Sequence, residues 1–156
     1  MLEIKLFFRK HWGEVEKSSP EDKYFPTEDI ASARELFTLS PSNFYNYGRV
    51  IIRTDYQVLI DSDCELDYFI SCIQDDKQAI FSGQTHTIDN SYFKLRFHYH
   101  DKLTIEAGSK KIVVKKQDFI TAFREAAESY YSLLADFKVN TTYYRTQAQQ
   151  VHNEWQ

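Results

Sequence analysis

A long run of alternating apolar and polar residues, from Tyr92 to Lys116, constrains the fold of this chain more than any other feature. A period of two is typical of strands that bury one face. The run is interrupted at residues 100–102 and at Gly108-Ser109, which predicts two tight turns, and glycine in the first position favours a type II′ turn. The sequence therefore predicts an antiparallel meander. Its apolar positions are Phe93, Leu95, Phe97, Tyr99, Leu103, Ile105, Ile112 and Val114.

The register of the meander follows from requiring these apolar residues to share one face, because a slip of one residue would move every side chain to the other face. This register pairs Phe97 with Ile105 across the first turn. The outer face then carries a ladder of Arg96, Glu106 and Lys111, in which opposite charges lie across from one another.

Two helical segments are predicted after the meander. Apolar residues at alternating spacings of three and four follow Asp118, which predicts a long helix that covers the apolar face of the meander. They are Ile120, Phe123, Ala127, Tyr130, Leu134 and Phe137. Residues 139–156 are more polar and predict an amphipathic tail or helix. Its apolar positions are Tyr144, Ala148, Val151 and Trp155.

The chain before the meander gives shorter signals. Alternation from Leu2 to Phe8 predicts a strand, and Thr27 is a suitable N-cap for a short helix. Two β-rich runs, Arg49–Arg53 and Tyr56–Ile60, flank the turn-compatible pair Thr54-Asp55 and predict a hairpin.

A further helix is predicted from about Asp63 to Phe81. Its apolar positions are Leu66, Phe69, Ile70, Ile73 and Ile80. This helix would contain Cys64 and Cys72, whose Cα atoms would be about 12 Å apart at the helical rise per residue. That separation is too long for a disulfide, so both thiols are expected to be free.

Together these elements predict the α+β class, with an antiparallel meander packed against a long C-terminal helix and one or two further helices. Residues 1–138 form one predicted domain, followed by the segment 139–156. A chain of 156 residues with twelve Phe and eleven Tyr can fill a single core. Free thiols, a start without a signal-peptide pattern and no apolar run near 20 residues predict a cytoplasmic protein that does not enter a membrane.

The charge of the chain is unevenly distributed. Seven carboxylates and no Lys, Arg or His occur between residues 55 and 76: Asp55, Asp61, Asp63, Glu65, Asp67, Asp75 and Asp76. The dipole of the predicted helix accounts for three of them, since Asp63, Glu65 and Asp67 fall in its first turn. The block either solvates a surface or attracts a basic partner, and we predict that its seven residues bind a basic protein.

Catalytic and cofactor motifs give no support for an enzyme. Residues 61–65 begin like a calcium loop, but Leu66 and Cys72 stand where that loop needs glycine and glutamate. His98 and His100 share one strand face without a further metal ligand at a recognisable spacing. His11 could act as a general base, but the sequence has no serine or cysteine nucleophile motif for it to activate. No catalytic residue, metal or cofactor is therefore predicted. Nucleic acid is not a predicted partner either, because the aromatic residues of the basic segment 94–116 occupy the buried phase of its strands.

The chain resembles the small acidic immunity proteins of bacterial toxin systems, including those of contact-dependent growth inhibition. The similarity lies in the size, the acidic block 55–76, the meander 93–114 and the sequence Ala126-Ala127-Glu128-Ser129-Tyr130-Tyr131-Ser132-Leu133-Leu134 in the closing helix. The resemblance implies a non-catalytic protein that binds one cognate toxin, often a basic nuclease domain, and blocks it. Two alternatives remain: an interaction or structural subunit of another cytoplasmic assembly, and an enzyme that uses His98, His100 and nearby acids.

Overall fold

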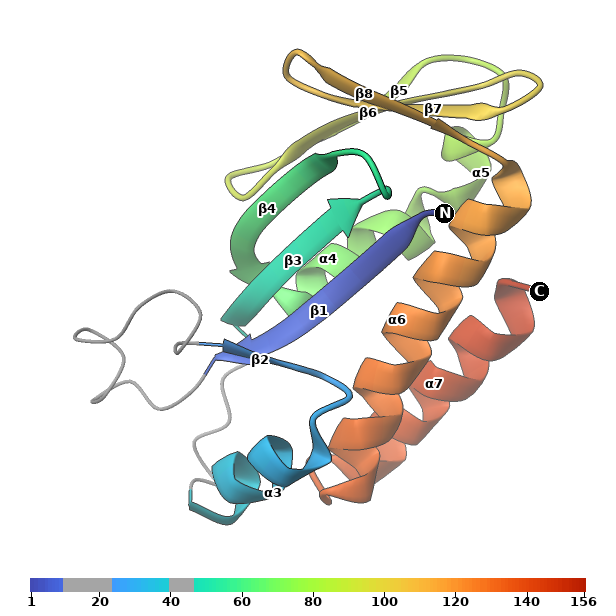
Figure 1. The fold of residues 1–156 in the computed structure, drawn as a ribbon. Helices are drawn as coiled ribbons and strands as arrows, with labels where there is room; N and C mark the ends of the chain where they lie inside the picture. Colours follow the sequence, from blue (N-terminus) through green and yellow to red (C-terminus); the bar gives the residue numbers. More distant parts are fainter. Residues whose placement is uncertain (10–23, 40–46) are drawn as a thin grey trace.

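The computed structural model describes residues 1–9, 24–39 and 47–156, and within them it shows an α+β protein with two four-stranded antiparallel sheets and five helices (Figure 1). The first sheet has the order β2-β1-β3-β4, with β1 (Glu3–Arg9), β2 (Tyr24–Pro26), β3 (Tyr47–Arg53) and β4 (Val58–Glu65). The second sheet has the order β5-β6-β7-β8, with β5 (His86–Asp89), β6 (Lys94–Tyr99), β7 (Leu103–Ala107) and β8 (Lys110–Val114). The helices are α3 (Ile30–Leu39), α4 (Leu66–Asp75), α5 (Lys77–Ile80), α6 (Lys116–Asp136) and α7 (Thr141–Glu154). None of these described helices has the length and apolar character needed to cross a bilayer.

The predicted meander forms strands β6, β7 and β8 in the predicted register. Phe97 lies opposite Ile105, and the outer ladder of Arg96, Glu106 and Lys111 is present, with Arg96 Nε 3.8 Å from a carboxylate oxygen of Glu106. Gly108 has a φ of +60°, as the first central residue of a type II′ turn requires. Strand β5 adds a fourth strand beside β6 that the sequence analysis did not assign.

The long C-terminal helix is also present, and it begins at Lys116, two residues before the predicted start. Phe123 is fully buried, as the predicted helix phase requires. The first turns of α6 contact the meander, where the rings of Phe119 and Phe97 have centroids 6.0 Å apart. The rest of the helix lies along β1 of the first sheet and beside α7 (Figure 1).

The terminal segment is a helix that completes the core. The side chain of Trp155, which follows α7, is fully buried, and its ring centroid lies 4.3 Å from that of Phe123. Arg124 of α6 donates a hydrogen bond from Nη1 to the Trp155 carbonyl at 2.8 Å. The ammonium group of Lys77 lies 4.9 Å from the centre of the Trp155 ring.

In the first sheet, β1 pairs with β3 from Glu3 to Phe8, with Leu6 opposite Val50. Glycine at position 48 allows a close approach of β3 to β1, because a Cβ atom there would lie 2.1 Å from the carbonyl oxygen of Phe7 and 3.0 Å from Cδ1 of Leu66. Between the sheets, the side-chain amide of Gln57 donates a hydrogen bond to the Lys111 carbonyl of β8.

The predicted helix 63–81 is wrong at its start and in its continuity. Strand β4 extends through Glu65, because Asp63 and its neighbours pair with β3, and Cys64 is buried opposite Gly48. Helix α4 begins only at Leu66, and a turn at Asp76 separates it from α5. The two cysteines are therefore in different elements, and both are free as predicted.

Two smaller corrections concern turns. The hairpin of β3 and β4 is present, but its loop contains the four residues 54–57 and is closed by a hydrogen bond from the Thr54 N–H to the Gln57 carbonyl at 2.9 Å. Helix α3 is capped by Asp29, which accepts a hydrogen bond from the Ser32 N–H at 3.1 Å. Thr27, the predicted cap, is buried and instead donates its N–H to the Leu6 carbonyl at 3.1 Å.

Candidate functional site

The seven carboxylates of the acidic block do not form one continuous surface. Asp55 lies in the loop between β3 and β4, and Asp61 and Asp63 project from the same face of β4. Asp67 points into the interior in the first turn of α4. The remaining three are Glu65 at the end of β4 and Asp75 and Asp76 at the end of α4.

Two of these carboxylates have partners that come from other strands. Nε and Nη2 of Arg49 each donate a hydrogen bond to the Asp61 carboxylate, both at 2.5 Å. These bonds raise the pKa of the Arg49 guanidinium group. Asp63 accepts a hydrogen bond from the Tyr24 hydroxyl at 2.7 Å. Burial, together with this bond, raises the pKa of Tyr24 to about 12. The block is therefore partly neutralised by residues that are distant in the sequence.

The other carboxylates of the acidic block also differ in whether they have a charged or hydrogen-bonding partner. Asp76 lies 2.8 Å from Nε2 of His86, and Asp55, which is 70% exposed, lies 3.2 Å from the Met1 ammonium group. Within the described part of the chain, Glu65 and Asp75 have neither a hydrogen-bonded side chain nor an ion pair. Only part of the predicted binding set is thus available as unpaired surface charge.

Asp67 belongs to an internal group that we call the Asp67 cluster (Asp67, Tyr130, Tyr131 and Tyr144). Its Oδ2 accepts a hydrogen bond from the Tyr144 hydroxyl at 2.9 Å. The Tyr130 hydroxyl and Oδ1 of Asp67 are both buried and make no hydrogen bond of good geometry with the described residues. Burial, and then the negative charge of Asp67, raises the pKa of all three tyrosines. This half-buried carboxylate therefore joins α4 to α7 by a hydrogen bond and directs its Oδ1 into the interior, towards the tyrosines of α6.

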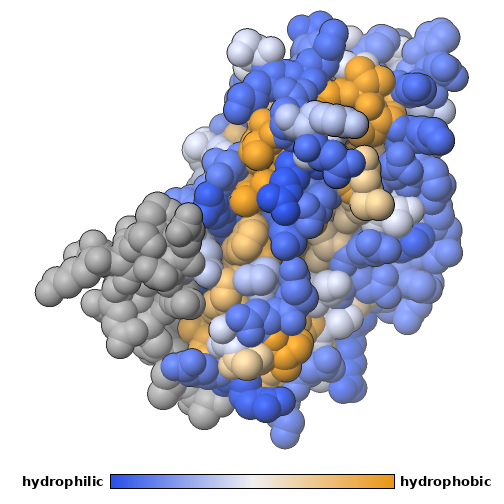
Figure 2. Space-filling model, in the orientation of Figure 1, coloured by the Kyte–Doolittle hydropathy of each residue, from blue (hydrophilic) through white to orange (hydrophobic). Residues whose placement is uncertain are grey.

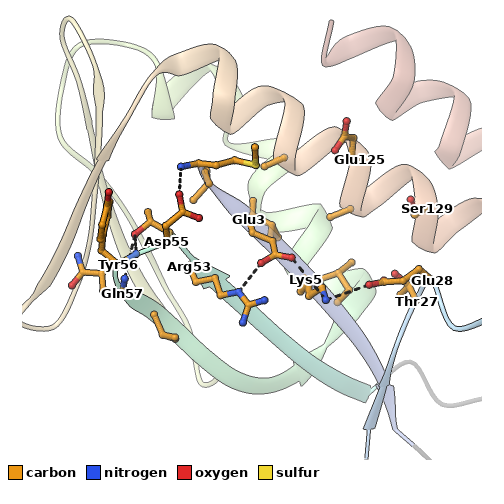
Figure 3. A pocket seen from close by; sticks show the side chains of 18 residues that line it. Glu3, Lys5, Thr27, Glu28, Arg53, Asp55, Tyr56, Gln57, Glu125 and Ser129 are labelled. Atoms are coloured by element: carbon orange, nitrogen blue, oxygen red, sulfur yellow. Dashed lines mark hydrogen bonds and ion pairs between the residues drawn. The ribbon is translucent and has the colours of Figure 1, made fainter.

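A groove beside Asp55 lies between described residues and has a volume of about 920 Å³. We call it the β1–α6 groove, because it runs along β1 from Leu2 to Leu6, with α6 on its other side and the loop 54–57 at its mouth (Figure 3). Leu2, Ile4, Ala122 and Ala126 supply apolar walls. Its volume lies near the upper end of the range for ligand clefts in proteins.

Charged side chains form a chain of ion pairs along the sheet side of the groove (Figure 3). Arg53 Nε lies 2.6 Å from Glu3 Oε2, and Lys5 Nζ lies 3.8 Å from Glu3 Oε1 and 3.4 Å from Glu28 Oε1. On the helix side, Glu125 is exposed and has no ion pair within the described residues. The groove is therefore lined by four carboxylates, counting Asp55, and by three cations, which are Lys5, Arg53 and the Met1 ammonium group.

Exposed apolar groups gather at the mouth of this groove. Tyr56 is 95% exposed at the tip of the loop, Met1 is almost as exposed, and Val58 is 39% exposed; all three line the same groove. In Figure 2, hydrophobic atoms emerge between polar ones on this face of the molecule. Apolar surface rimmed by charge is typical of sites where proteins bind one another.

The other candidate residues remain separate. His98 is exposed, with Nδ1 3.2 Å from the Thr85 hydroxyl, and His11 lies outside the described residues. No group of three or more metal-ligand side chains occurs in the ranges 1–9, 24–39 and 47–156. Burial raises the pKa of Cys64 to about 12, which keeps its thiol protonated at neutral pH.

The groove itself was missed by the sequence analysis. Glu3 and Lys5 show only as the polar phase of a strand, and Glu125 shows only as a polar position of a helix. The one local signal was Tyr56, an aromatic residue directly after a predicted turn. Comparison of the chain with protein-family models, curated proteins and solved structures found no match.

Proposed function

We propose that this chain is a non-catalytic binding protein that neutralises a cognate bacterial toxin by occluding it, and that the bound toxin domain is basic, as a nuclease domain would be. The observation that carries the proposal is the β1–α6 groove, where an exposed tyrosine and other apolar side chains lie beside a surplus of carboxylates. Tyrosine is over-represented among residues that dominate binding energy. A negative rim attracts a positively charged partner and speeds association.

The role of a toxin inhibitor rests on the resemblance to immunity proteins, and the binding chemistry rests on the groove. Such a protein acts beside its toxin in the cytoplasm. Within the acidic block, Asp55 contributes directly to the groove, while the outward-facing Asp61 and Asp63 extend the negative surface along β4. Asp67 contributes to the stability of the fold and not to the contact, because its carboxylate is held by Tyr144 inside the protein.

The test is co-expression with the toxin domain encoded beside this gene, followed by measurement of association rates at low and high salt. We expect the wild-type protein to restore growth and to bind the purified domain. The double variant Asp55→Asn/Glu125→Gln should associate about tenfold more slowly at low salt and should show a weaker salt dependence. Tyr56→Ala should accelerate dissociation.

The matched control is Asp101→Asn/Asp136→Asn, which removes two exposed carboxylates that do not line the groove. It should retain the wild-type rates. A second double variant, Asp61→Asn/Asp63→Asn, measures the contribution of the β4 surface. Failure of the wild-type protein to bind or neutralise the toxin domain would refute the proposed function, and equal rates for the groove variant and its control would refute the role of the groove.

A further inference from the structure

An open strand edge lines the β1–α6 groove. The Thr27 N–H donates to the Leu6 carbonyl, so Leu6 directs its backbone polar groups towards the β2 side of β1. Because these groups alternate sides along a strand, Ile4 directs its N–H and C=O the same way. The hydrogen bond from the Thr54 N–H to the Gln57 carbonyl leads to the same conclusion for Ile4. It shows that even-numbered residues of β3 direct their backbone groups to β4, so odd-numbered residues of β3 bond to the odd-numbered residues of β1, and the even-numbered residues of β1 face the other side.

No described strand pairs with β1 at this point. Strand β2 ends at Pro26, and the bond from the Asp29 N–H to the Pro26 carbonyl turns the chain away into α3. The pairing of β1 with β2 covers only Phe7, Phe8 and Arg9, and Thr27 adds one bond at Leu6. In Figure 1 the N-terminal half of β1 accordingly lies between β3 on one side and α6 on the other. Ile4 is buried as a whole residue, but its backbone groups on this side have no partner strand among the described residues, and such an edge is a template for an additional strand.

We propose that the β1–α6 groove binds an extended, basic segment of the protein partner as an added strand beside Leu2–Leu6. This inference rests on the proposed function and specifies its binding mode. An extended segment gains main-chain hydrogen bonds from Ile4, and its alternate side chains enter the groove or project from it. The small side chains Ala122 and Ala126 of α6 leave room for those that enter.

The charges of the groove select the chemistry of the segment. Side chains of an added strand that lie beside Glu3 project to the outer face, where Glu28 and Asp55 also lie, and Glu125 of α6 lines the same groove. Lys5 and Arg53 already pair with Glu3 and Glu28, and the Met1 ammonium group pairs with Asp55. Glu125 is therefore the groove carboxylate that an added cation meets without an ion pair among the described residues. Residues that lie beside Ile4 face the apolar wall. The segment that fits therefore alternates basic and apolar residues.

The probe is a dye-labelled peptide, acetyl-Arg-Val-Arg-Val-Arg-amide, measured by fluorescence anisotropy against the full chain. Two comparison peptides isolate the two parts of the proposal. One carries Glu in place of Arg, and the other keeps Arg but has an N-methyl group on the backbone nitrogen of every residue, which blocks pairing at both edges of the strand without changing charge. We expect both to bind at least about tenfold more weakly than the probe. The variant Glu125→Gln should weaken binding of the probe, and Asp136→Asn, on the same helix outside the groove, should not.

The site of binding is read by amide hydrogen exchange, because an added strand should slow exchange at Ile4. Equal affinity of the N-methylated peptide, or unchanged exchange at Ile4 with the probe bound, would overturn the added strand. Equal binding of the Glu peptide would overturn the charge preference. If the toxin domain binds and is neutralised while Ile4 exchange stays unchanged in that complex, the binding mode fails and the proposed function stands. If the peptide protects Ile4 but no toxin is neutralised, the proposed function fails alone.

Discussion

The Asp67 cluster should contribute measurably to stability through a single hydroxyl group. Tyr144→Phe removes the hydrogen bond that Asp67 accepts at 2.9 Å and leaves the shape of the ring unchanged. A hydrogen bond to a charged acceptor contributes about 1.5–3 kcal/mol when it is removed from a buried site. For a domain of this size, each kcal/mol lowers Tm by about 2–4 °C, so a fall of about 3–12 °C is expected.

The assay is urea unfolding at pH 7, followed by tyrosine and tryptophan fluorescence. The matched control is Tyr131→Phe, because Tyr131 stacks on Tyr144 with ring centroids 5.7 Å apart, yet no described side chain hydrogen-bonds to its hydroxyl. Loss of the Tyr131 hydroxyl should cost less stability than loss of the Tyr144 hydroxyl, because it breaks no side-chain hydrogen bond between described residues. Tyr130→Phe should be neutral or stabilising, since it removes a buried hydroxyl that lacks a well-formed hydrogen bond. If Tyr144→Phe and Tyr131→Phe lose equally little stability, the reasoning about the Asp67 carboxylate is refuted.

Three further predictions address packing and pH. Phe123→Ala should lower the free energy of unfolding by about 3–5 kcal/mol in urea titrations, because it empties a fully buried site beside Trp155, and a loss under about 1 kcal/mol would contradict that packing. Gly48→Ala should disrupt the first sheet, since the new Cβ would clash with the Phe7 carbonyl oxygen. A native circular dichroism spectrum with unchanged Tm would count against the close approach of β1 and β3 at this position. Stability should begin to fall near pH 9, where the unfolded chain ionises the Cys64 thiol that burial keeps protonated. Above about pH 10 it should fall further, by up to about 1.4 kcal/mol per pH unit for each tyrosine of the Asp67 cluster, because the unfolded chain releases phenol protons that the native state retains; no steepening between pH 10 and 11 would exclude the raised pKa values of the tyrosines.

The parts of the fold that could be predicted are those in which pattern and turn chemistry agree. In the meander, alternation and a glycine turn impose one register, and that register is observed. In β4 they conflict, because Asp61 and Asp63 are polar residues in a strand whose outer face is open, and acidic residues at this spacing are equally consistent with the start of a helix. The structure resolves the conflict through Arg49, which lies on the neighbouring strand and neutralises Asp61.

The candidate site was less predictable because it depends on contacts between distant residues. Glu3 and Arg53 are fifty residues apart, and Glu125 comes from a helix near the other end of the chain. Their separate positions show only that each is polar and exposed to solvent. The open edge at Ile4 follows from where β2 ends, and that boundary depends on the local hydrogen bonds of Pro26 and Asp29 rather than on any periodic signal.

The order of strands in the two sheets has a consequence for how the chain folds. Every pairing in the second sheet joins strands that are neighbours in the sequence, so it forms by closing short loops. The first sheet places β3 against β1, with β2 and α3 lying between them in the chain, which costs more loop entropy before any contact is gained. The second sheet should therefore nucleate folding, and the β1–α6 groove should be among the last parts of the molecule to form.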